Sequence, residues 1–148
     1  MILDQITLNN KDVAVCYSNT LYNIPIVPTL LREAATLIDS GNAFPTIFLK
    51  DSQSVIWFEN DEDVIAFIVF ENHIEGRQSC FIHFSWVNPK HRGNGIRSLI
   101  QNYLEDICKK NEIYVISTQT FVKNESIDRS YEKIGLMPLT YMRYKKLK

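Results

Sequence analysis

The residues with the clearest chemical potential form a loop with two glycines among basic side chains, which leads straight into an amphipathic helix. The loop reads Val87-Asn88-Pro89-Lys90-His91-Arg92-Gly93-Asn94-Gly95-Ile96. Glycines let a ligand approach the backbone, and the first turn of a helix exposes unpaired N–H groups and a partial positive charge. The loop therefore predicts a binding site for an anion such as a diphosphate, with further donors from Lys90, His91, Arg92 and Arg97.

The glycine pattern fits neither of two well-known phosphate-binding signatures. Ser98 stands where the dinucleotide pattern GxGxxG needs its third glycine, and the GK[ST] of a Walker loop is absent. Two glycines also occur in many tight turns, so the loop alone leaves a purely structural role open.

Hydrophobic periodicity places this loop in an α/β domain. The fullest helical pattern covers residues 93–110, with apolar residues at spacings of three and four. The pattern before residue 30 is weak, and no element is assigned there. The expected order is a helix at 30–38, strands at 54–59, 64–71 and 79–87, the helix at 93–110, a strand at 113–117, a helix at 125–134 and a strand at 139–147. This order predicts a mixed, mostly antiparallel sheet flanked by helices.

Length and composition narrow the class of protein. The chain has 148 residues, 45% of them hydrophobic and 22% charged, which predicts one globular domain over residues 1–148. The longest apolar run, 64–70, is far shorter than the roughly 20 residues of a membrane span, and no secretory signal is visible. Cys16, Cys80 and Cys108 are widely separated, which favours a reducing, cytoplasmic setting over a disulfide framework or a zinc site.

Charge is distributed unevenly along the chain. Residues 1–75 hold 3 basic and 11 acidic residues, whereas residues 76–148 hold 13 basic and 6 acidic residues. The uneven distribution has two interpretations of equal weight. In the first it reflects only chance and solvent-exposed faces, and in the second the two halves have different binding partners. In the functional interpretation the second half receives an anion, and the first half faces a cation.

Two segments together resemble a known family. The loop, in the form Val87-x-Pro89-x-x-Arg92-Gly93-x-Gly95-Ile96, resembles the acetyl-CoA signature of the GNAT superfamily of N-acetyltransferases. A downstream segment resembles the superfamily's second signature; it reads Asn124-x-x-Ile127-x-x-x-Tyr131-Glu132-Lys133-x-Gly135-Leu136. The resemblance covers residues 54–147 and implies the acyl-CoA N-acyltransferase fold, acetyl-CoA as acyl donor and a domain that is often dimeric.

The resemblance also implies roles for particular residues. Strand 79–87 would carry a bulge and diverge from strand 113–117, which opens a slot for the pantetheine arm of CoA. The backbone of Trp86 and Val87 would pair with the pantetheine amides, and the backbone N–H groups of 92–96 would hold the diphosphate. Asn124 would bind pantetheine through its side chain, and Tyr131 would donate a proton to the CoA thiolate. The alternative for Asn124 is a helix N-cap or a turn residue, and the alternative for Tyr131 is a partly buried aromatic on a helix.

Three departures from the family pattern lie in the cofactor site. Arg97 replaces a common glycine and would add charge beside the phosphates, whereas Lys90 remains a donor in place of the usual Gln or Arg. Ile127 is bulkier than the usual residue and would narrow the slot.

The acceptor amine needs a base. Strand alternation predicts that His83 shares a face with Ser85 and Val87, and some superfamily members place a basic side chain at this position. Histidine titrates near neutral pH and suits the task, but a satisfied polar residue on a strand explains His83 as well. Glu71 and a water molecule are the other candidates. No set of His, Asp and Glu has the spacing of metal ligands, so no metal is predicted.

The sequence thus predicts an N-acetyltransferase that moves an acetyl group from acetyl-CoA to a primary amine by direct attack. The alternatives are use of a longer acyl-CoA and a CoA-binding regulatory or interaction module that has lost catalysis. Nucleic-acid binding through the basic half is less favoured because the net charge is not basic. The amine acceptor, a small molecule or a peptide, is left open.

Overall fold

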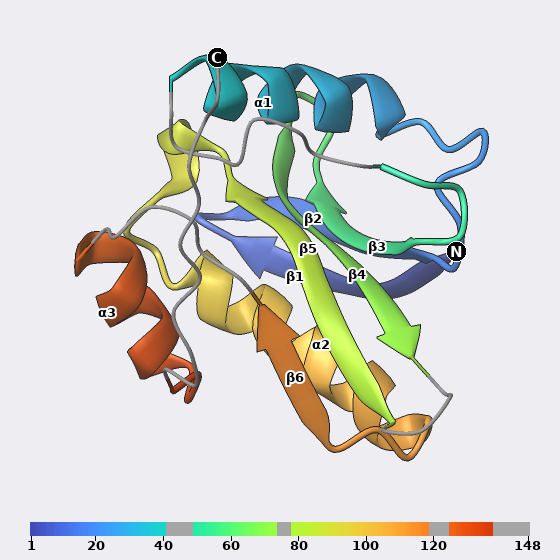
Figure 1. Ribbon diagram of the computed structural model, residues 1–148. Helices are drawn as coiled ribbons and strands as arrows, with labels where there is room; N and C mark the ends of the chain where they lie inside the picture. Colours follow the sequence, from blue (N-terminus) through green and yellow to red (C-terminus); the bar gives the residue numbers. More distant parts are fainter. Residues whose placement is uncertain (41–48, 74–77, 119–124, 138–148) are drawn as a thin grey trace.

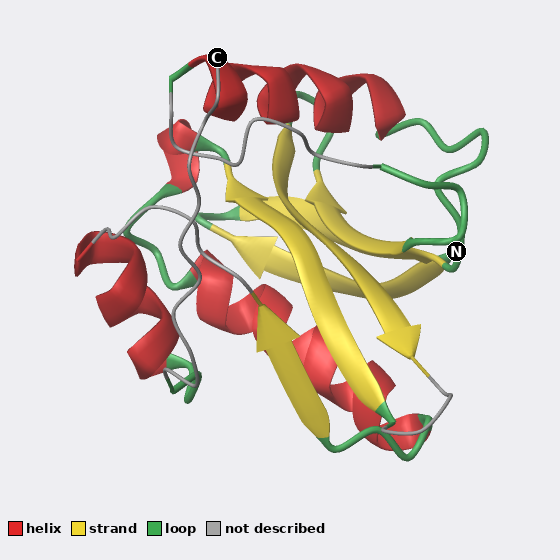
Figure 2. Ribbon diagram, viewed as in Figure 1, coloured by secondary structure: helices red, strands yellow, loops and turns green. Residues whose placement is uncertain are grey.

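A six-stranded sheet with helices on both faces is the frame of the molecule (Figures 1 and 2). The computed structural model describes residues 1–40, 49–73, 78–118 and 125–137. Within them the elements are β1 (Ile2–Leu8), β2 (Lys11–Ser18), α1 (Val27–Asp39), β3 (Ser54–Glu59), β4 (Val64–His73), β5 (Ser79–Val87), the short 3₁₀-helix η1 (Pro89–His91), α2 (Ile96–Lys110), β6 (Val115–Thr118) and α3 (Glu125–Lys133). The predicted fold class is confirmed.

The strands lie side by side in chain order, from β1 to β6. The pairs from β1 to β5 are antiparallel, whereas β5 and β6 are parallel and joined by α2. The acidic turn between β3 and β4 is closed by Asn60, whose Oδ1 accepts from the N–H groups of Glu62 (2.9 Å) and Asp63 (2.7 Å). The hairpin and crossover predicted from the sequence are therefore present.

The first two strands correct the sequence interpretation, which assigned no element before residue 30. Asn9 and Asn10 form the turn between β1 and β2, with φ of 50° and 62°. Two consecutive positive φ values are those of a type I′ turn, which asparagine tolerates and which matches the twist of a hairpin. Val13 and Val15 on β2 are buried, so this hairpin contributes to the core.

Helix α1 covers one face of the sheet. Pro28 stands in its first turn, where a missing N–H costs nothing, and Leu30 and Ala34 are its buried residues. The α1 core is the group of buried side chains between this helix and the sheet: Cys16, Leu21, Ile26, Leu30, Ala34, Val55, Trp57, Phe67, Val69, Phe84 and Trp86.

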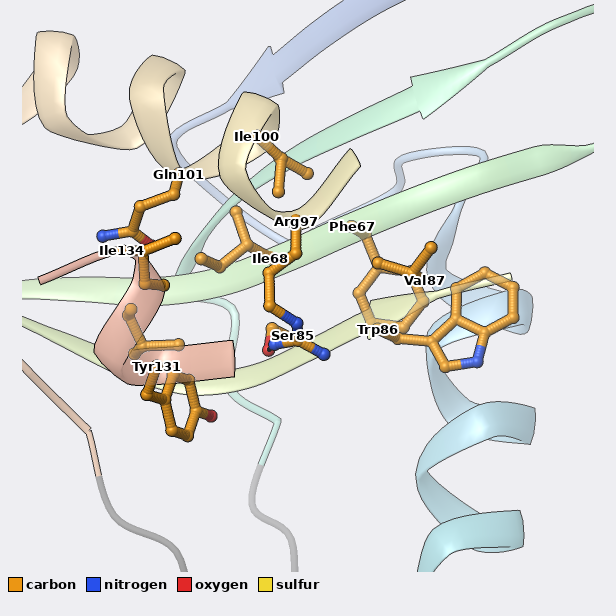
Figure 3. A pocket seen from close by; sticks show the side chains of 11 residues that line it. Phe67, Ile68, Ser85, Trp86, Val87, Arg97, Ile100, Gln101, Tyr131 and Ile134 are labelled. Carbon is orange, nitrogen blue, oxygen red and sulfur yellow. Dashed lines mark hydrogen bonds between the residues drawn. The ribbon is translucent and has the colours of Figure 1, made fainter. Parts of the chain in front are cut away.

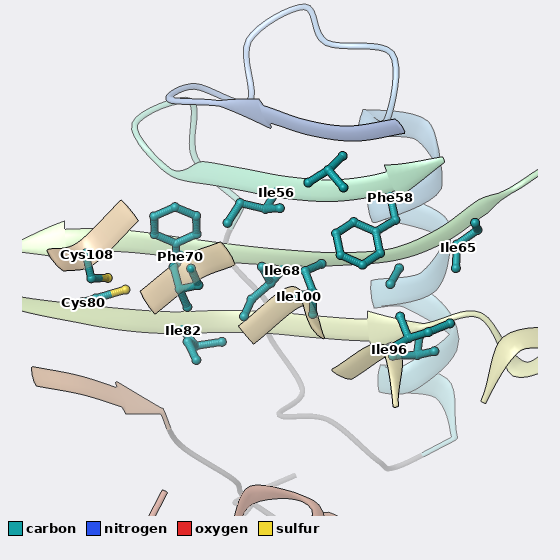
Figure 4. Close-up of a cluster of buried hydrophobic side chains, with 14 of the residues drawn as sticks. Ile56, Phe58, Ile65, Ile68, Phe70, Cys80, Ile82, Ile96, Ile100 and Cys108 are labelled. Carbon is teal, nitrogen blue, oxygen red and sulfur yellow. The ribbon is translucent and has the colours of Figure 1, made fainter. Parts of the chain in front are cut away.

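Helix α2 covers the opposite face. Ile96, Ile100 and Leu104 recur every four residues and are all buried, and each contributes about 1.5–3 kcal/mol by leaving water. Figure 4 shows Ile96 and Ile100 in this core. Cys80 of β5 lies beside Cys108 of α2 in the same core. The α2 core consists of Val13, Val15, Ile56, Phe58, Ile65, Ala66, Ile68, Phe70, Cys80, Ile82, Val87, Ile96, Ile100, Leu104, Cys108 and Ile113.

Several element boundaries differ from the expected ones. Helix α2 begins at Ile96 and not at residue 93, because Gly93 and Gly95 have φ of 83° and 73°, outside the right-handed helical region. Strand β6 covers 115–118 instead of 113–117, and α3 ends at Lys133, with Gly135 at φ 82° beyond it. The predicted strand at 139–147 lies outside the described residues.

A bulge in β5 reverses the faces of the residues that follow it. Phe70 pairs with Ile82 but Val69 pairs with Phe84, so His83 is an extra residue in the ladder. Before the bulge, Ile82 packs in the α2 core; after it, Phe84 packs in the α1 core. The bulge implied by the resemblance is therefore present in β5.

Candidate active site

The glycine loop is anchored to the sheet by Asn88. Its backbone N–H donates to the carbonyl of Ile65 (2.8 Å), and its side-chain Nδ2 donates to the carbonyl of Val64 (3.1 Å). Its Oδ1 accepts from the N–H of Lys90 (3.1 Å) and caps η1. A single side chain thus fixes the start of the loop against the first residues of β4.

Gly93 and Gly95 give the loop its shape and keep its outer surface open. Both have positive φ, where an L side chain is strained, and a Cβ at either position would meet nothing within 4 Å. The glycines are therefore required by backbone conformation and not by crowding. The open space above them is room for a ligand to reach the backbone, as predicted.

The N-terminus of α2 has the features of an anion site. Gly95 is its N-cap, no side chain caps it, and its first turn contains no acidic residue. The N–H of Leu99 donates to the carbonyl of Gly95 (3.1 Å), and the N–H groups ahead of it are those that a helix leaves without an intrahelical partner. The positive end of the helix dipole therefore faces the open side of the loop.

Three of the basic side chains around the loop already have hydrogen-bond partners, whereas Nε2 of His91 has none in the described structure. Lys90 Nζ lies 3.5 Å from Asp63 Oδ2, and His91 Nε2 lies 3.8 Å from the same carboxylate oxygen. Arg92 Nε donates to the carbonyl of Val87 (2.9 Å). Arg97 leaves the loop altogether, because its Nη1 donates to Ser85 Oγ on β5 (2.8 Å). The backbone, more than these side chains, is free to receive an anion.

A narrow slot lies beside the loop, between the second half of β5, the start of α2 and α3 (Figure 3). Among the described residues, β6 pairs with β5 only from Ser79 to Ile82, whereas β5 continues to Val87. The slot has a free volume of about 10 Å³, roughly enough for one water molecule. It is lined by Phe67, Ile68, Ile82, Ser85, Trp86, Val87, Arg97, Ile100, Gln101, Tyr131 and Ile134.

The structure brings most of the predicted cofactor residues to this slot and loop. Trp86 and Val87 line the slot on β5, and Tyr131 lines it from α3. The ring centroid of Tyr131 lies 5.8 Å from Cζ of Arg97. Asn124 lies outside the described residues, and so does the side chain of Ile127.

The two candidate bases form one pair. His83 Nε2 lies 2.9 Å from Glu71 Oε2, and the two side chains are 25% and 27% exposed. The ring of Phe81 packs edge-on against the imidazole, with centroids 4.9 Å apart. A carboxylate only accepts hydrogen bonds, so the neutral tautomer of the imidazole that fits this contact carries its proton on Nε2 and its lone pair on Nδ1.

The prediction that His83 shares a face with Ser85 and Val87 is wrong. Phe81 stands between Cys80 and Ile82 of the α2 core, so its side chain lies on the face of the sheet opposite α2. The imidazole of His83 contacts Phe81 and lies on that same face. The bulge at His83 then turns Val87 into the α2 core and lets Ser85 bond to Arg97 of α2. Strand alternation fails here because it assumes an unbroken ladder.

Cys16 and Cys80 are poor candidates for a nucleophile. Burial, followed by the charge of Glu59, raises the pKa of Cys16 to about 11. A hydrogen bond with Cys108 and burial also raise the pKa of Cys80. All three cysteines are buried free thiols. A mechanism of direct attack on the substrate, without a covalent enzyme intermediate, is consistent with this.

Sequence reasoning missed Asn88 and Ser85 as parts of the site. An Asn before a proline at the end of a strand is a turn signal, which could have identified Asn88 as a cap. Nothing in the sequence marks Ser85, because its orientation depends on the bulge. A second, more open hollow of about 380 Å³ lies between α2, β6 and the end of α3, and among the described residues none with a predicted catalytic or cofactor-binding role lines it.

A family model of GNAT acetyltransferases matches residues 21–136. The chain belongs to the GNAT acetyltransferase family. A search among curated proteins found no match in sequence. No helix in the described part of this GNAT protein has the length and apolar character needed to span a membrane.

Solved structures of GNAT proteins share this fold. A GNAT-family acetyltransferase from Listeria monocytogenes is 13% identical, with a TM-score of 0.68 and 94% of each chain covered. Ribosomal-protein-alanine N-acetyltransferase from Brucella melitensis is 15% identical, with a TM-score of 0.61 over 91% of this chain and 99% of that chain. Aminoglycoside N-acetyltransferase AAC(6')-Iy, solved with CoA, is 11% identical, with a TM-score of 0.65 over 90% of this chain and 98% of that chain.

Proposed function

We propose that this GNAT protein is an N-acetyltransferase that transfers the acetyl group of acetyl-CoA to a primary amine by direct attack. The observation that carries the proposal is the uncapped N-terminus of α2 beside the slot, whose wall includes Tyr131. Membership of an acetyltransferase family supports it.

The donor's diphosphate would bind the backbone N–H groups of residues 92–96. Both glycines leave that backbone open, and the helix dipole favours negative charge there. The pantetheine arm would then enter the slot along Trp86 and Val87, at the part of β5 beyond its described pairing with β6. Backbone groups that have no strand partner can bond to the amides of this arm.

His83 would act as the base. An amine is protonated near neutral pH and attacks only after losing a proton. With Nε2 held by Glu71 at 2.9 Å, Nδ1 of His83 is the nitrogen that accepts this proton, directly or through a water. Glu71 would stabilise the imidazolium that results, and so would act through His83.

The bulge and Tyr131 would manage the charge that develops during attack. A bulge leaves its extra residue out of the ladder, so the backbone at His83 offers a donor for the thioester oxygen as it becomes negative. Tyr131 would give its phenolic proton to the departing CoA sulfur. The acidic first half of the chain favours a cationic amine on the acceptor side.

The test is CoA release, measured with a thiol reagent, in the presence of acetyl-CoA and a panel of amines. The panel contains small primary amines, polyamines and peptides with free N-termini, and hydrolysis without amine is the background. We expect at least one amine to raise CoA release well above this background. Binding of acetyl-CoA with no acceptor-dependent release from any amine class would instead support a CoA-binding module.

A further inference from the structure

Arg97 crosses the slot from one wall to the others (Figure 3). It stands in the first turn of α2, donates to Ser85 Oγ on β5 (2.8 Å) and lies 5.8 Å from the ring centroid of Tyr131 on α3. Its guanidinium therefore contacts both elements between which the pantetheine arm would pass.

Arg97 is also a side chain that can leave the slot. With about 10 Å³ of free volume, the slot admits no pantetheine arm as it stands. Four of its wall residues are buried and packed in place: Trp86, Val87, Ile100 and Gln101. Arg97 is only half-buried, and its long side chain has a charged head that can rotate towards solvent.

We infer that Arg97 closes the empty slot and that the diphosphate of an acyl-CoA opens it by binding the guanidinium, which makes Arg97 a residue that selects donors carrying a diphosphate. This inference rests on the proposed function. Arg97 would then do more than add a contact to the phosphates, because its side chain would occupy the slot whenever no donor is bound.

The exchange of partners is favourable for a donor with a diphosphate. In the closed slot the guanidinium has a neutral hydroxyl and an aromatic face as partners, whereas a diphosphate offers charged, bidentate hydrogen bonds. The backbone of Arg97 belongs to the helix turn where the diphosphate is expected, so the side chain starts next to that site. A thioester without a diphosphate must open the slot with no such compensation, and its apparent affinity falls by the fraction of open slot.

The experiment compares acetyl-CoA with S-acetylpantetheine, which has the same thioester arm but no phosphate, by isothermal titration. Arg97→Ala empties the slot, and Ser85→Ala removes the bond that holds the guanidinium there while keeping the charge. We expect S-acetylpantetheine to bind about tenfold more tightly to either variant than to the unmodified protein. We expect Ser85→Ala to bind acetyl-CoA more tightly by a similar factor, because both donors need the open slot and the guanidinium is still present to bind the diphosphate.

Lys90→Ala is the matched control, because it removes a cation from the same loop but not from the slot. It should weaken acetyl-CoA and leave S-acetylpantetheine unchanged. Unchanged or weaker binding of S-acetylpantetheine to both Arg97→Ala and Ser85→Ala overturns the inference while the proposed function stands. If acetyl-CoA binds neither the unmodified protein nor any variant, the proposed function fails first. Circular dichroism establishes whether each variant is folded. If Arg97→Ala is not folded, the binding of S-acetylpantetheine to Ser85→Ala alone tests the inference.

Discussion

The imidazole of His83 and the carboxylate of Glu71 form a side-chain pair across two neighbouring strands, with 2.9 Å between Nε2 and Oε2. Glu71 is directly opposite Phe81 in the β4–β5 ladder, and the ring of Phe81 packs against the imidazole. The pair lies at the bulge, beside the part of β5 that lines the slot. Two residues that look like separate candidate bases in the sequence are therefore one unit in the fold.

His83→Ala should lower kcat for acetyl transfer about 100-fold or more, because it removes the group that takes the amine's proton. Added imidazole should restore part of the lost rate, since a small base can enter the space left by the side chain. Steady-state kinetics with and without imidazole measures both effects. A rate that is lost but not restored by imidazole would assign His83 a structural role.

Glu71→Gln should cost less, about tenfold in kcat, because the amide still accepts a hydrogen bond from Nε2 but no longer carries the compensating charge. The acetyl-CoA KM should stay close to that of the unmodified protein. If Glu71→Gln abolishes the rate and His83→Ala leaves it largely intact, then Glu71 is the base.

Tyr131→Phe should lower kcat by about 100-fold and change acetyl-CoA affinity by less than about threefold, since the ring still lines the slot while the proton donor is lost. The split between kcat and affinity is measured by combining kinetics with equilibrium titration. Equal losses in both quantities would show that Tyr131 only packs against the donor.

Gly95→Ala should weaken acetyl-CoA binding about tenfold or more, because a side chain at φ 73° strains the backbone that would bind the diphosphate. Gly135→Ala is the matched control: its φ is 82°, it lies beyond α3, and its Cβ would also meet nothing within 4 Å. Both variants should lose about 1 kcal/mol of stability, but only Gly95→Ala should lose affinity. Equal affinities of the two variants for acetyl-CoA would show that the glycine loop is not part of the binding site.

Tyr103→Phe tests the contact between α2 and β1. Burial, together with the hydrogen bond to Asp4 (2.7 Å), raises the pKa of Tyr103 from 10.0 to about 12. The folded state therefore holds this proton more tightly than the unfolded state, and the stability it contributes is present below pH 10 and lost as the pH rises to about 12.

Urea unfolding between pH 8 and pH 12 measures this effect. The unmodified protein should exceed Tyr103→Phe in stability by about 0.5–1 kcal/mol at pH 8, and the difference should disappear towards pH 12. A difference that stays constant over this range would mean that the phenol proton does not contribute to the folded state.

Much of the fold could be predicted from residues whose pattern is local. The apolar stripe that contains Ile96, Ile100 and Leu104 identifies α2, and the glycines locate the loop before it. The β1–β2 hairpin was missed although Asn9-Asn10 carries a type I′ signal, because β1 is exposed over most of its length and shows little alternation.

The site was predictable where it consists of backbone and unpredictable where it depends on side-chain direction. Gly93 and Gly95 adopt the conformations that their types suggest. The orientation of Ser85 depends on the bulge at His83, and a bulge follows from the pairing of two strands, not from either strand alone. Arg97 points to Ser85 for the same reason.

The proposed activity requires that the loop at the start of α2 and the adjoining slot bind acetyl-CoA, and calorimetric titration of the unmodified protein with acetyl-CoA measures this binding. We expect saturable binding at one site per chain, with about 2.7 kcal/mol of added stability at a donor concentration ~100 times Kd. Absence of binding at millimolar acetyl-CoA would contradict it.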